Sequence, residues 1–142
     1  MKLNKPRFWD SKKSLLAIFL FPLTLVTTLI TYLRRITSKP ISFKIPVICI
    51  GNIYIGGTGK TPSAIFLAHE LKKIGKNPVI VKKYYKNQKD EQSLIKKYFN
   101  NLILNKKRSD AIYEAERKGF DSVILDDGFQ DFNIKKDLNI IC

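Results

Sequence analysis

One glycine-rich run contains the residues best suited to chemistry. Gly56-Gly57-Thr58-Gly59-Lys60-Thr61 comes shortly after an apolar run at residues 47–50. Glycines let successive backbone N–H groups turn towards one anion, and a helix that starts there adds partial positive charge. The lysine of such a loop can reach the β- and γ-phosphates of a nucleotide, and the hydroxyl after it can ligate Mg²⁺. We therefore predict a phosphate-binding loop, with Lys60 on the phosphates of a nucleotide and Thr61 on Mg²⁺.

We expect the loop to contact the nucleotide through eight consecutive residues, which are Tyr54, Ile55, Gly56, Gly57, Thr58, Gly59, Lys60 and Thr61. The strict eight-residue pattern has glycine in place of Tyr54. ATPases that position proteins or carry metals have a signature lysine in place of Ile55, so that subclass is disfavoured. The alternative for the whole run is a glycine-rich strand-to-helix turn that binds no ligand.

Two carboxylates follow another apolar run. Ser122 to Leu125 has the composition of a buried strand, and Asp126-Asp127-Gly128 comes directly after it. Open parallel sheets bind ligands outside the carboxyl ends of their strands, and a carboxylate there can hold the Mg²⁺ of a nucleotide. We predict that Asp126 and Asp127 serve the metal. The alternative is an acidic turn, because Asp-Gly favours turns.

The elements that must position these side chains alternate along the chain. Short β-branched or apolar runs predict strands, and longer periodic runs predict helices. The expected strands are residues 47–50, 78–82, 101–104, 122–125 and 138–141, and the expected helices are residues 63–74, 91–99 and 110–118. This alternation predicts an α/β fold with a parallel sheet and right-handed crossovers.

Residues 14–33 form a stretch of twenty positions without a charged side chain. As a helix this stretch would be about 30 Å long, which matches the hydrocarbon core of a bilayer. Lys12-Lys13 precede it and Arg34-Arg35 follow it, so basic residues on both sides leave its orientation open. We predict a membrane helix that either spans the bilayer or lies in its interface. The alternative is a buried helix of a globular domain.

Three segments follow from these patterns. Residues 1–36 are expected to be a membrane-associated helix with basic flanks, and residues 37–44 a short polar linker. Residues 45–142 are expected to form a phosphate-loop domain.

The charge of the chain implies an anionic partner. The formal net charge is +14 over 142 residues, which suits nucleic acid, an acidic membrane surface or phosphorylated ligands. Residues 82–89 interleave lysines with two tyrosines, and this stretch could be a groove for an anionic ligand, a platform for stacked bases or a solvated lysine-rich surface. The two cysteines, Cys49 and Cys142, provide no disulfide framework and fit a reducing compartment.

Together these motifs resemble those of the tetraacyldisaccharide 4'-kinase family, the lipid A 4'-kinases of Gram-negative envelopes. The resemblance rests on IPVICIGNIYIGGTGKTP at residues 45–62, on ILDDGFQ at residues 124–130 and on an uncharged N-terminal helix before the phosphate loop. It implies a P-loop kinase fold that uses ATP and Mg²⁺ to phosphorylate the 4'-hydroxyl of a tetraacyldisaccharide 1-phosphate, a lipid A precursor. Family members are considerably longer, so we expect this chain to be a fragment that lacks a second α/β portion.

The same resemblance implies a catalytic base. Asp90-Glu91 match the two acids of the family's Gly-Asp-Glu-Pro motif, whose aspartate is implicated in activating the sugar hydroxyl. Asp90 is therefore the candidate base, and Lys60 the candidate catalytic cation on the phosphates. The sequence departs from the family pattern at three places: the family's Ser-Arg-Gly-Tyr-Gly is replaced at residues 82–86, the Gly and Pro around the two acids are replaced by Lys89 and Gln92, and the histidine that often follows DDGFQ is Asp131.

The expected partners are the lipid A disaccharide precursor and anionic lipid, at the cytoplasmic face of the bacterial inner membrane. No nucleic acid is expected, and the sequence indicates no oligomeric state. The alternative function is a membrane-anchored nucleotide-binding module, or an inactive fragment without kinase activity. A third candidate, a basic ATPase that acts on nucleic acid, lacks recognisable base-stacking or groove-reading motifs.

Overall fold

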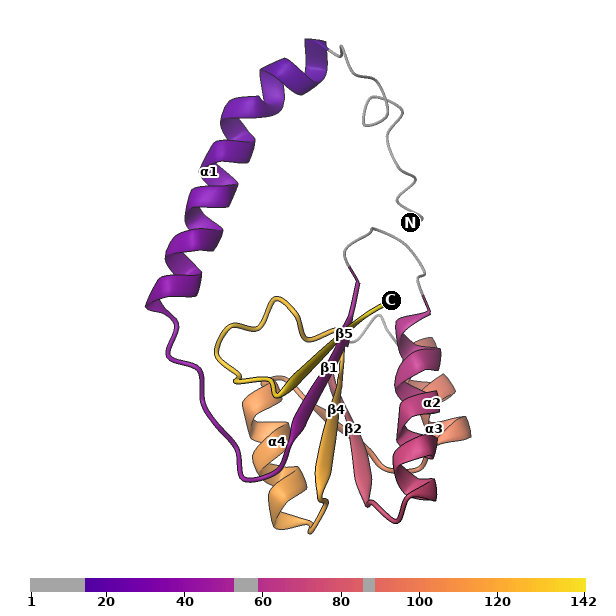
Figure 1. Ribbon diagram of the computed structural model, residues 1–142. Helices are drawn as coiled ribbons and strands as arrows, with labels where there is room; N and C mark the ends of the chain where they lie inside the picture. Colours follow the sequence, from indigo (N-terminus) through magenta and orange to yellow (C-terminus); the bar gives the residue numbers. More distant parts are fainter. Residues whose placement is uncertain (1–14, 53–58, 86–88) are drawn as a thin grey trace. The chain divides into compact units, whose positions relative to one another are not determined.

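The computed structural model describes residues 15–52, 59–85 and 89–142 (Figure 1). The chain divides into two units, Met1–Lys39 and Pro40–Cys142. The division falls within the stretch expected to be a linker, residues 37–44. Ile41 pairs with Ile134 in a parallel bridge, so the second half of that stretch belongs to the second unit.

The second unit is built on a five-stranded sheet in which every strand pair is parallel. Its strands are β1 (Val47–Gly51), β2 (Pro78–Lys83), β3 (Leu102–Asn105), β4 (Ser122–Asp126) and β5 (Leu138–Ile141). Their order across the sheet is β3-β2-β4-β1-β5. The predicted α/β class and parallel sheet are thus confirmed, with each strand within one residue of its expected bounds.

Three helices of this unit cover the two faces of the sheet (Figure 1). They are α2 (Lys60–Lys73), α3 (Lys89–Tyr98) and α4 (Arg108–Arg117). Each begins two or three residues before its predicted start. The first N–H groups of a helix have no intrahelical partner and are satisfied by polar side chains, water or ligands. Polar residues therefore suit the first turn, and the apolar periodicity that predicts a helix begins later than the helix itself.

Alternate strand residues pack into two separate cores. Ile50, Ile80 and Ile124 pack with α2 and α3 on one face, whereas Val79, Val81, Val123 and Leu125 pack with α4 on the other. This alternation follows from the two-residue period of a strand. It also means that Lys82 and Asp126, which follow Ile80 and Ile124 by two residues, lie on the face of the sheet that packs against α2 and α3.

The loops after β1 and β4 meet at the edge where the ligand-binding residues were predicted. β1 and β4 are neighbours, yet the chain leaves β1 towards β2 and leaves β4 towards β5, on opposite sides of the pair. Such a reversal of strand order is where open parallel sheets bind ligands. A Cβ added to Gly51 would lie 2.6 Å from the Phe129 ring, so glycine at the end of β1 lets the segment after β4 pack directly on it.

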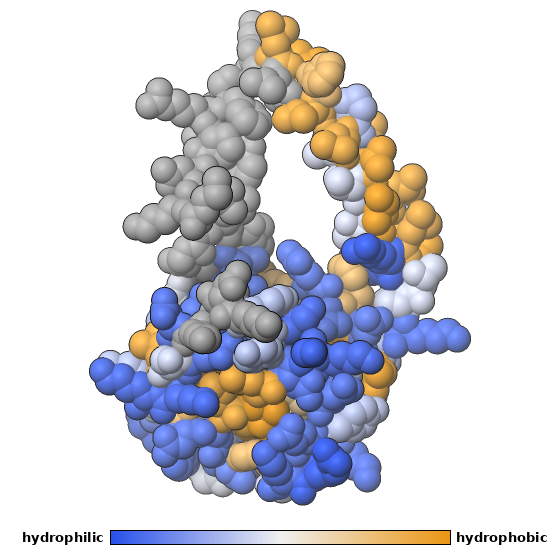
Figure 2. Space-filling model, turned by 180° about the vertical axis from the view of Figure 1, so that it is seen from behind, coloured by the Kyte–Doolittle hydropathy of each residue, from blue (hydrophilic) through white to orange (hydrophobic). Residues whose placement is uncertain are grey.

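The first unit contains α1 (Leu15–Thr37). Its residues Ile18–Thr37 are long and apolar enough to cross a membrane, and none of that stretch is buried within the structure. Apolar side chains make up much of the exposed surface of this helix (Figure 2). Its threonine hydroxyls donate to carbonyls of the preceding turn, as in Thr24 to Phe21 O at 2.7 Å and Thr31 to Thr27 O at 2.8 Å.

Candidate phosphate- and metal-binding site

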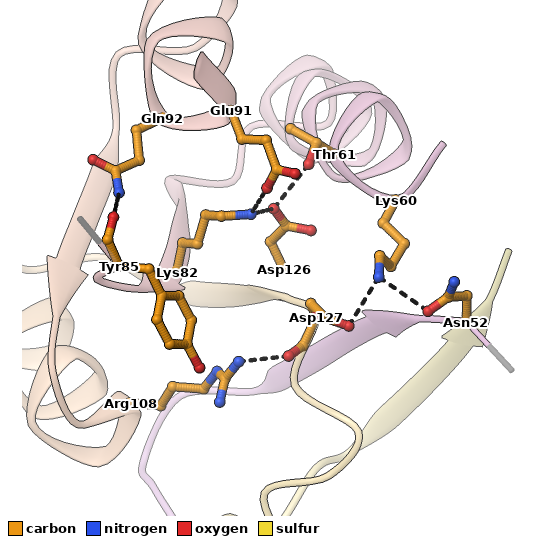
Figure 3. Close-up of polar contacts among 10 residues, drawn as sticks. All are labelled: Asn52, Lys60, Thr61, Lys82, Tyr85, Glu91, Gln92, Arg108, Asp126 and Asp127. Atoms are coloured by element: carbon orange, nitrogen blue, oxygen red, sulfur yellow. Dashed lines mark hydrogen bonds and ion pairs between the residues drawn. The ribbon is translucent and has the colours of Figure 1, made fainter. Parts of the chain in front are cut away.

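Polar side chains gather at the carboxyl ends of β1, β2 and β4 (Figure 3). Strand register brings them together, because Ile50 of β1 and Lys82 of β2 both pair with Asp126 of β4. α2 begins at Lys60 beside these strand ends, directly after Gly59, whose φ of 80° lies in the left-handed region that favours glycine. Within the residues that the structure describes, no side-chain hydrogen bond caps this helix, and the first N–H groups of a helix can bind an anion.

Thr61 and Asp126 form the buried part of the site. The Thr61 hydroxyl donates to Oδ2 of Asp126 at 3.0 Å, and the two residues are 8% and 1% exposed. Oδ1 of Asp126 is buried and has no hydrogen-bond partner in the described part of the chain. A buried carboxylate oxygen without a donor fits a cation, and with the Thr61 hydroxyl it offers two oxygen ligands of the kind that Mg²⁺ prefers.

Lys60 and Asp127 form a more exposed ion pair. Nζ of Lys60 lies 3.1 Å from Oδ1 of Asp127 and 3.0 Å from Oδ1 of Asn52. Asp127 has a φ of 61°, an uncommon conformation for a residue other than glycine, and its backbone N–H donates to Ile50 O at 2.9 Å. Asp126 and Asp127 are neighbours in sequence, but only Asp126 contacts the other predicted metal ligand, Thr61.

Lys82 belongs to the site, although the sequence analysis assigned it only to a strand and to a basic stretch. Its Nζ lies 2.7 Å from Oδ2 of Asp126 and 2.5 Å from Oε2 of Glu91. Burial would lower the pKa of Lys82, but the charge of Asp126 and the hydrogen bonds to Asp126 and Glu91 outweigh it and raise this pKa above its usual value. The side chain is therefore a charged ammonium, only 5% exposed.

Strand alternation is the signal that would have found Lys82. It lies two residues after Ile80, so it points at α2 and α3 from within a strand that is buried on both faces. A lysine at such a position must reach a carboxylate, because an unpaired buried charge is costly.

Arg108 is a second residue that the sequence analysis missed. It begins α4 and is 11% exposed; its Nη2 donates to Asp127 O at 2.5 Å, and Nη1 lies 3.7 Å from Oδ2 of Asp131. Its Nε is buried without a partner among the residues that the structure describes. The available signal was its place just after β3, at the same edge of the sheet as the other strand ends.

The remaining predicted site residues divide into two groups. Asp90 lies in the first turn of α3, exposed, and makes no hydrogen bond or ion pair in the described part of the chain. Five predicted phosphate-loop residues lie outside the described residues: Tyr54, Ile55, Gly56, Gly57 and Thr58. In residues 15–52, 59–85 and 89–142, no group of three or more His, Cys, Asp or Glu side chains could hold a metal. A metal at Thr61 and Asp126 would take its other ligands from water or from a bound anion.

Comparison with known proteins gives consistent matches. The family model described as tetraacyldisaccharide-1-P 4'-kinase matches residues 16–142. The tetraacyldisaccharide 4'-kinase of Pelagibacter ubique is 48% identical over all of this chain and 45% of its own length. That of Aliarcobacter butzleri is 33% identical over 92% of this chain and 46% of its own length.

A solved structure agrees with these matches. The crystal structure of LpxK from Aquifex aeolicus in complex with ATP superposes with a TM-score of 0.73 and 26% identity. The match covers 89% of this chain and 49% of that one. The chain thus spans somewhat less than half the length of these curated relatives and about half of the solved chain.

The different burial of the two adjacent aspartates predicts different effects on stability. Asp126→Asn removes a charge that balances the buried Lys82 ammonium, so it should lower the free energy of unfolding by about 3 kcal/mol. Asp127→Asn removes only an exposed ion pair, and asparagine also tolerates a positive φ. This substitution should therefore lower the free energy of unfolding by less than about 1 kcal/mol. Urea unfolding of the 142-residue chain in detergent, followed by circular dichroism, measures both. Equal losses would contradict the pairing described here.

Proposed function

Because the chain belongs to the tetraacyldisaccharide-1-P 4'-kinase family, we propose that it forms the nucleotide-binding half of a lipid kinase. The proposed reaction transfers the γ-phosphate of ATP to the 4'-hydroxyl of a tetraacyldisaccharide 1-phosphate. The observation that carries this proposal is the contact of Lys60 and Thr61, at the start of α2, with the two consecutive aspartates at the carboxyl end of β4, one in its last position and one directly after it. Phosphoryl transfer needs mainly positioning and neutralisation of charge, and this arrangement supports both.

On the phosphate side, Lys60 is the proposed cation. Its Nζ is paired with Asp127 and Asn52. The Asp127 side chain is 57% exposed. Water can therefore solvate the Asp127 carboxylate when a phosphate takes its place as the partner of Lys60. The N–H groups at the start of α2 would add donors to the same anion.

Thr61 and Asp126 are the proposed residues for Mg²⁺, which when bound would neutralise charge on the β- and γ-phosphates. The unpartnered Oδ1 of Asp126 and the Thr61 hydroxyl support this assignment. Asp127 remains a proposed second acid for the metal and its waters, at the exposed side of the site.

On the acceptor side, Asp90 is the proposed base for the sugar hydroxyl. Its neighbour Glu91 is held by Lys82, which fixes the first turn of α3 next to the strand ends. The exposed carboxylate of Asp90 is accessible to a substrate and could accept the proton that the 4'-hydroxyl loses on attack.

The lipid substrate requires access to a membrane, and α1 supports that part of the proposal. A helix with an apolar surface and no burial inside the protein suits a bilayer. Threonine hydroxyls that donate to the helix's own carbonyls cost little in an apolar medium, and Arg34 and Arg35 at its end suit anionic lipid headgroups. We propose attachment at the cytoplasmic face of the bacterial inner membrane, where ATP is present.

The nucleotide assignment predicts a loss of Mg·ATP binding in Lys60→Ala. Loss of a charge-assisted contact worth about 1.5–3 kcal/mol should weaken binding roughly ten- to hundredfold. Thr61→Ala should weaken binding only when Mg²⁺ is present. Calorimetric titration of the folded chain with ATP, with and without Mg²⁺, measures both, and Lys73→Ala at the exposed end of α2 is the matched control. An unchanged affinity of Lys60→Ala for Mg·ATP would contradict the assignment of Lys60 to the phosphates.

The base assignment predicts a selective effect on turnover. The test protein is a fusion of this chain to the remaining, C-terminal part of a curated relative. In this fusion, Asp90→Ala should lower kcat about 10²–10⁴-fold and leave ATP affinity intact. Asp110→Ala, in the first turn of α4, is the control. Transfer of labelled phosphate from ATP to the lipid disaccharide measures the rate.

Two results of that assay would change the proposal. Normal turnover by Asp90→Ala would remove Asp90 from the mechanism. If the fusion protein without substitutions binds ATP but transfers no phosphate, the result would favour the alternative function, a membrane-anchored nucleotide-binding module.

The membrane assignment predicts that removal of residues 1–36 releases the protein from anionic vesicles. Replacing Arg34 and Arg35 with glutamine should weaken binding by about 1 kcal/mol per charge and make it less sensitive to salt. Sedimentation with vesicles of anionic and neutral lipid measures the bound fraction. If the parent chain stays in the supernatant with both, α1 belongs to a protein interface.

A further inference from the structure

A buried lysine, Lys82, contacts Asp126, the buried acid of the proposed metal site. Lys82 is the inward-facing residue near the carboxyl end of β2, directly paired in register with Asp126. Its ammonium lies between Asp126 of β4 and Glu91 of α3 (Figure 3), with 2.7 Å and 2.5 Å to one oxygen of each. One nitrogen therefore joins three elements around the strand ends.

The two oxygens of Asp126 are used very differently. Oδ2 accepts hydrogen bonds from both Thr61 and Lys82. Oδ1 is equally buried and has no partner among the described residues. The carboxylate thus has one oxygen that accepts from two side chains and one that accepts from none of the described residues.

We propose that the Lys82 ammonium is an internal cation of this site, which neutralises Asp126 and ties it to Glu91 and so prevents the nucleotide-free site from binding a divalent cation. This inference rests on the proposed function, in which Asp126 belongs to a Mg·ATP site. It adds a role for a residue on the β2 side of that site.

Charge accounts for the effect. Asp126 and Glu91 both lie within hydrogen-bond distance of one atom, so without Lys82 they would be two neighbouring carboxylates, the kind of ligand pair that Mg²⁺ and Mn²⁺ bind. With Lys82 present the three side chains carry a net charge of about −1 instead of −2, and the position between the acids is filled. Repulsion between an ammonium and a divalent cation is strong at such short range in a partly desolvated site.

As a consequence, binding of a divalent metal to this site is favoured only when an anion binds with it. A triphosphate brings its own negative charge and its own oxygen ligands, so a metal bound to it needs little more than Oδ1 of Asp126 and the Thr61 hydroxyl from the protein. This agrees with the lack of a three-acid cluster in the described part of the chain.

The test is a Mn²⁺ titration of the nucleotide-free 142-residue chain in detergent, followed by the loss of free Mn²⁺ signal in electron paramagnetic resonance. Lys82→Met should bind Mn²⁺ about tenfold or more tightly than the parent chain. Lys83→Met removes the same charge from the next residue, which faces the other side of β2, and should leave the affinity unchanged. Equal affinity of the parent and Lys82→Met would overturn the inference.

Loss of the buried cation could prevent folding, and two measurements cover that case. A metal-dependent fold of Lys82→Met, seen as a melting temperature that rises with Mn²⁺ while that of the parent does not, supports the inference. If the variant stays unfolded at all Mn²⁺ concentrations, Lys82→Gln combined with Glu91→Gln keeps the parent's net charge of about −1 at the site and replaces the ammonium with a neutral amide donor beside Asp126. Because the ammonium no longer repels a cation at that position, this variant should still bind Mn²⁺ more tightly than the parent, and equal affinity would overturn the inference.

A separate titration with ATP distinguishes this inference from the proposed function. Failure of the parent to bind Mg·ATP removes the proposed function but leaves the metal comparison intact. A Lys82→Met variant that binds Mg·ATP normally and gains no Mn²⁺ affinity overturns the internal cation alone. Weaker binding of metal-free ATP with unchanged Mn²⁺ affinity also overturns it, by assigning Lys82 to the phosphates.

Discussion

The buried carboxylate of Asp126 is the constraint on which the rest of the site depends. A charge that is 1% exposed must be paired, and its partners come from the start of α2 and the end of β2. Through Lys82 the same network reaches Glu91 in α3. The stability of this corner of the fold and the geometry of its candidate site therefore depend on one set of contacts.

Local patterns in the sequence were sufficient to predict the strands and helices of the second unit. The strand bounds follow from short β-branched runs, and the meeting of Thr61 with Asp126 follows from the rule that parallel strands present their carboxyl ends at one edge. The roles of Lys82 and Arg108 depend on long-range pairing. Nothing near Lys82 in the sequence shows that residue 126 lies beside it, since that fact is a property of the β2–β4 register.

The divergence of Asp126 and Asp127 shows a second limit of sequence patterns. Both are acids at the end of one strand, and the sequence analysis treated them alike. Asp126 is still within β4 and points to the α2 side with the parity of Ile124. Asp127 leaves the strand with a φ of 61°, which turns its side chain towards Lys60. The backbone conformation at residue 127 thus separates a buried carboxylate from an exposed counter-ion, and composition carries little information about that conformation.

The same chain of contacts bears on the acceptor side of the proposed reaction. Asp90 and Glu91 are consecutive on α3, so their side chains leave the helix about 100° apart. Lys82 holds Glu91 against the strand ends, and this orientation leaves Asp90 at the exposed side of the first turn. The cation that neutralises the acid of the proposed metal site also sets the direction of the proposed base. A loss of Lys82 would then disturb both sides of the site, and Glu91, which Lys82 contacts directly, would carry that effect to Asp90.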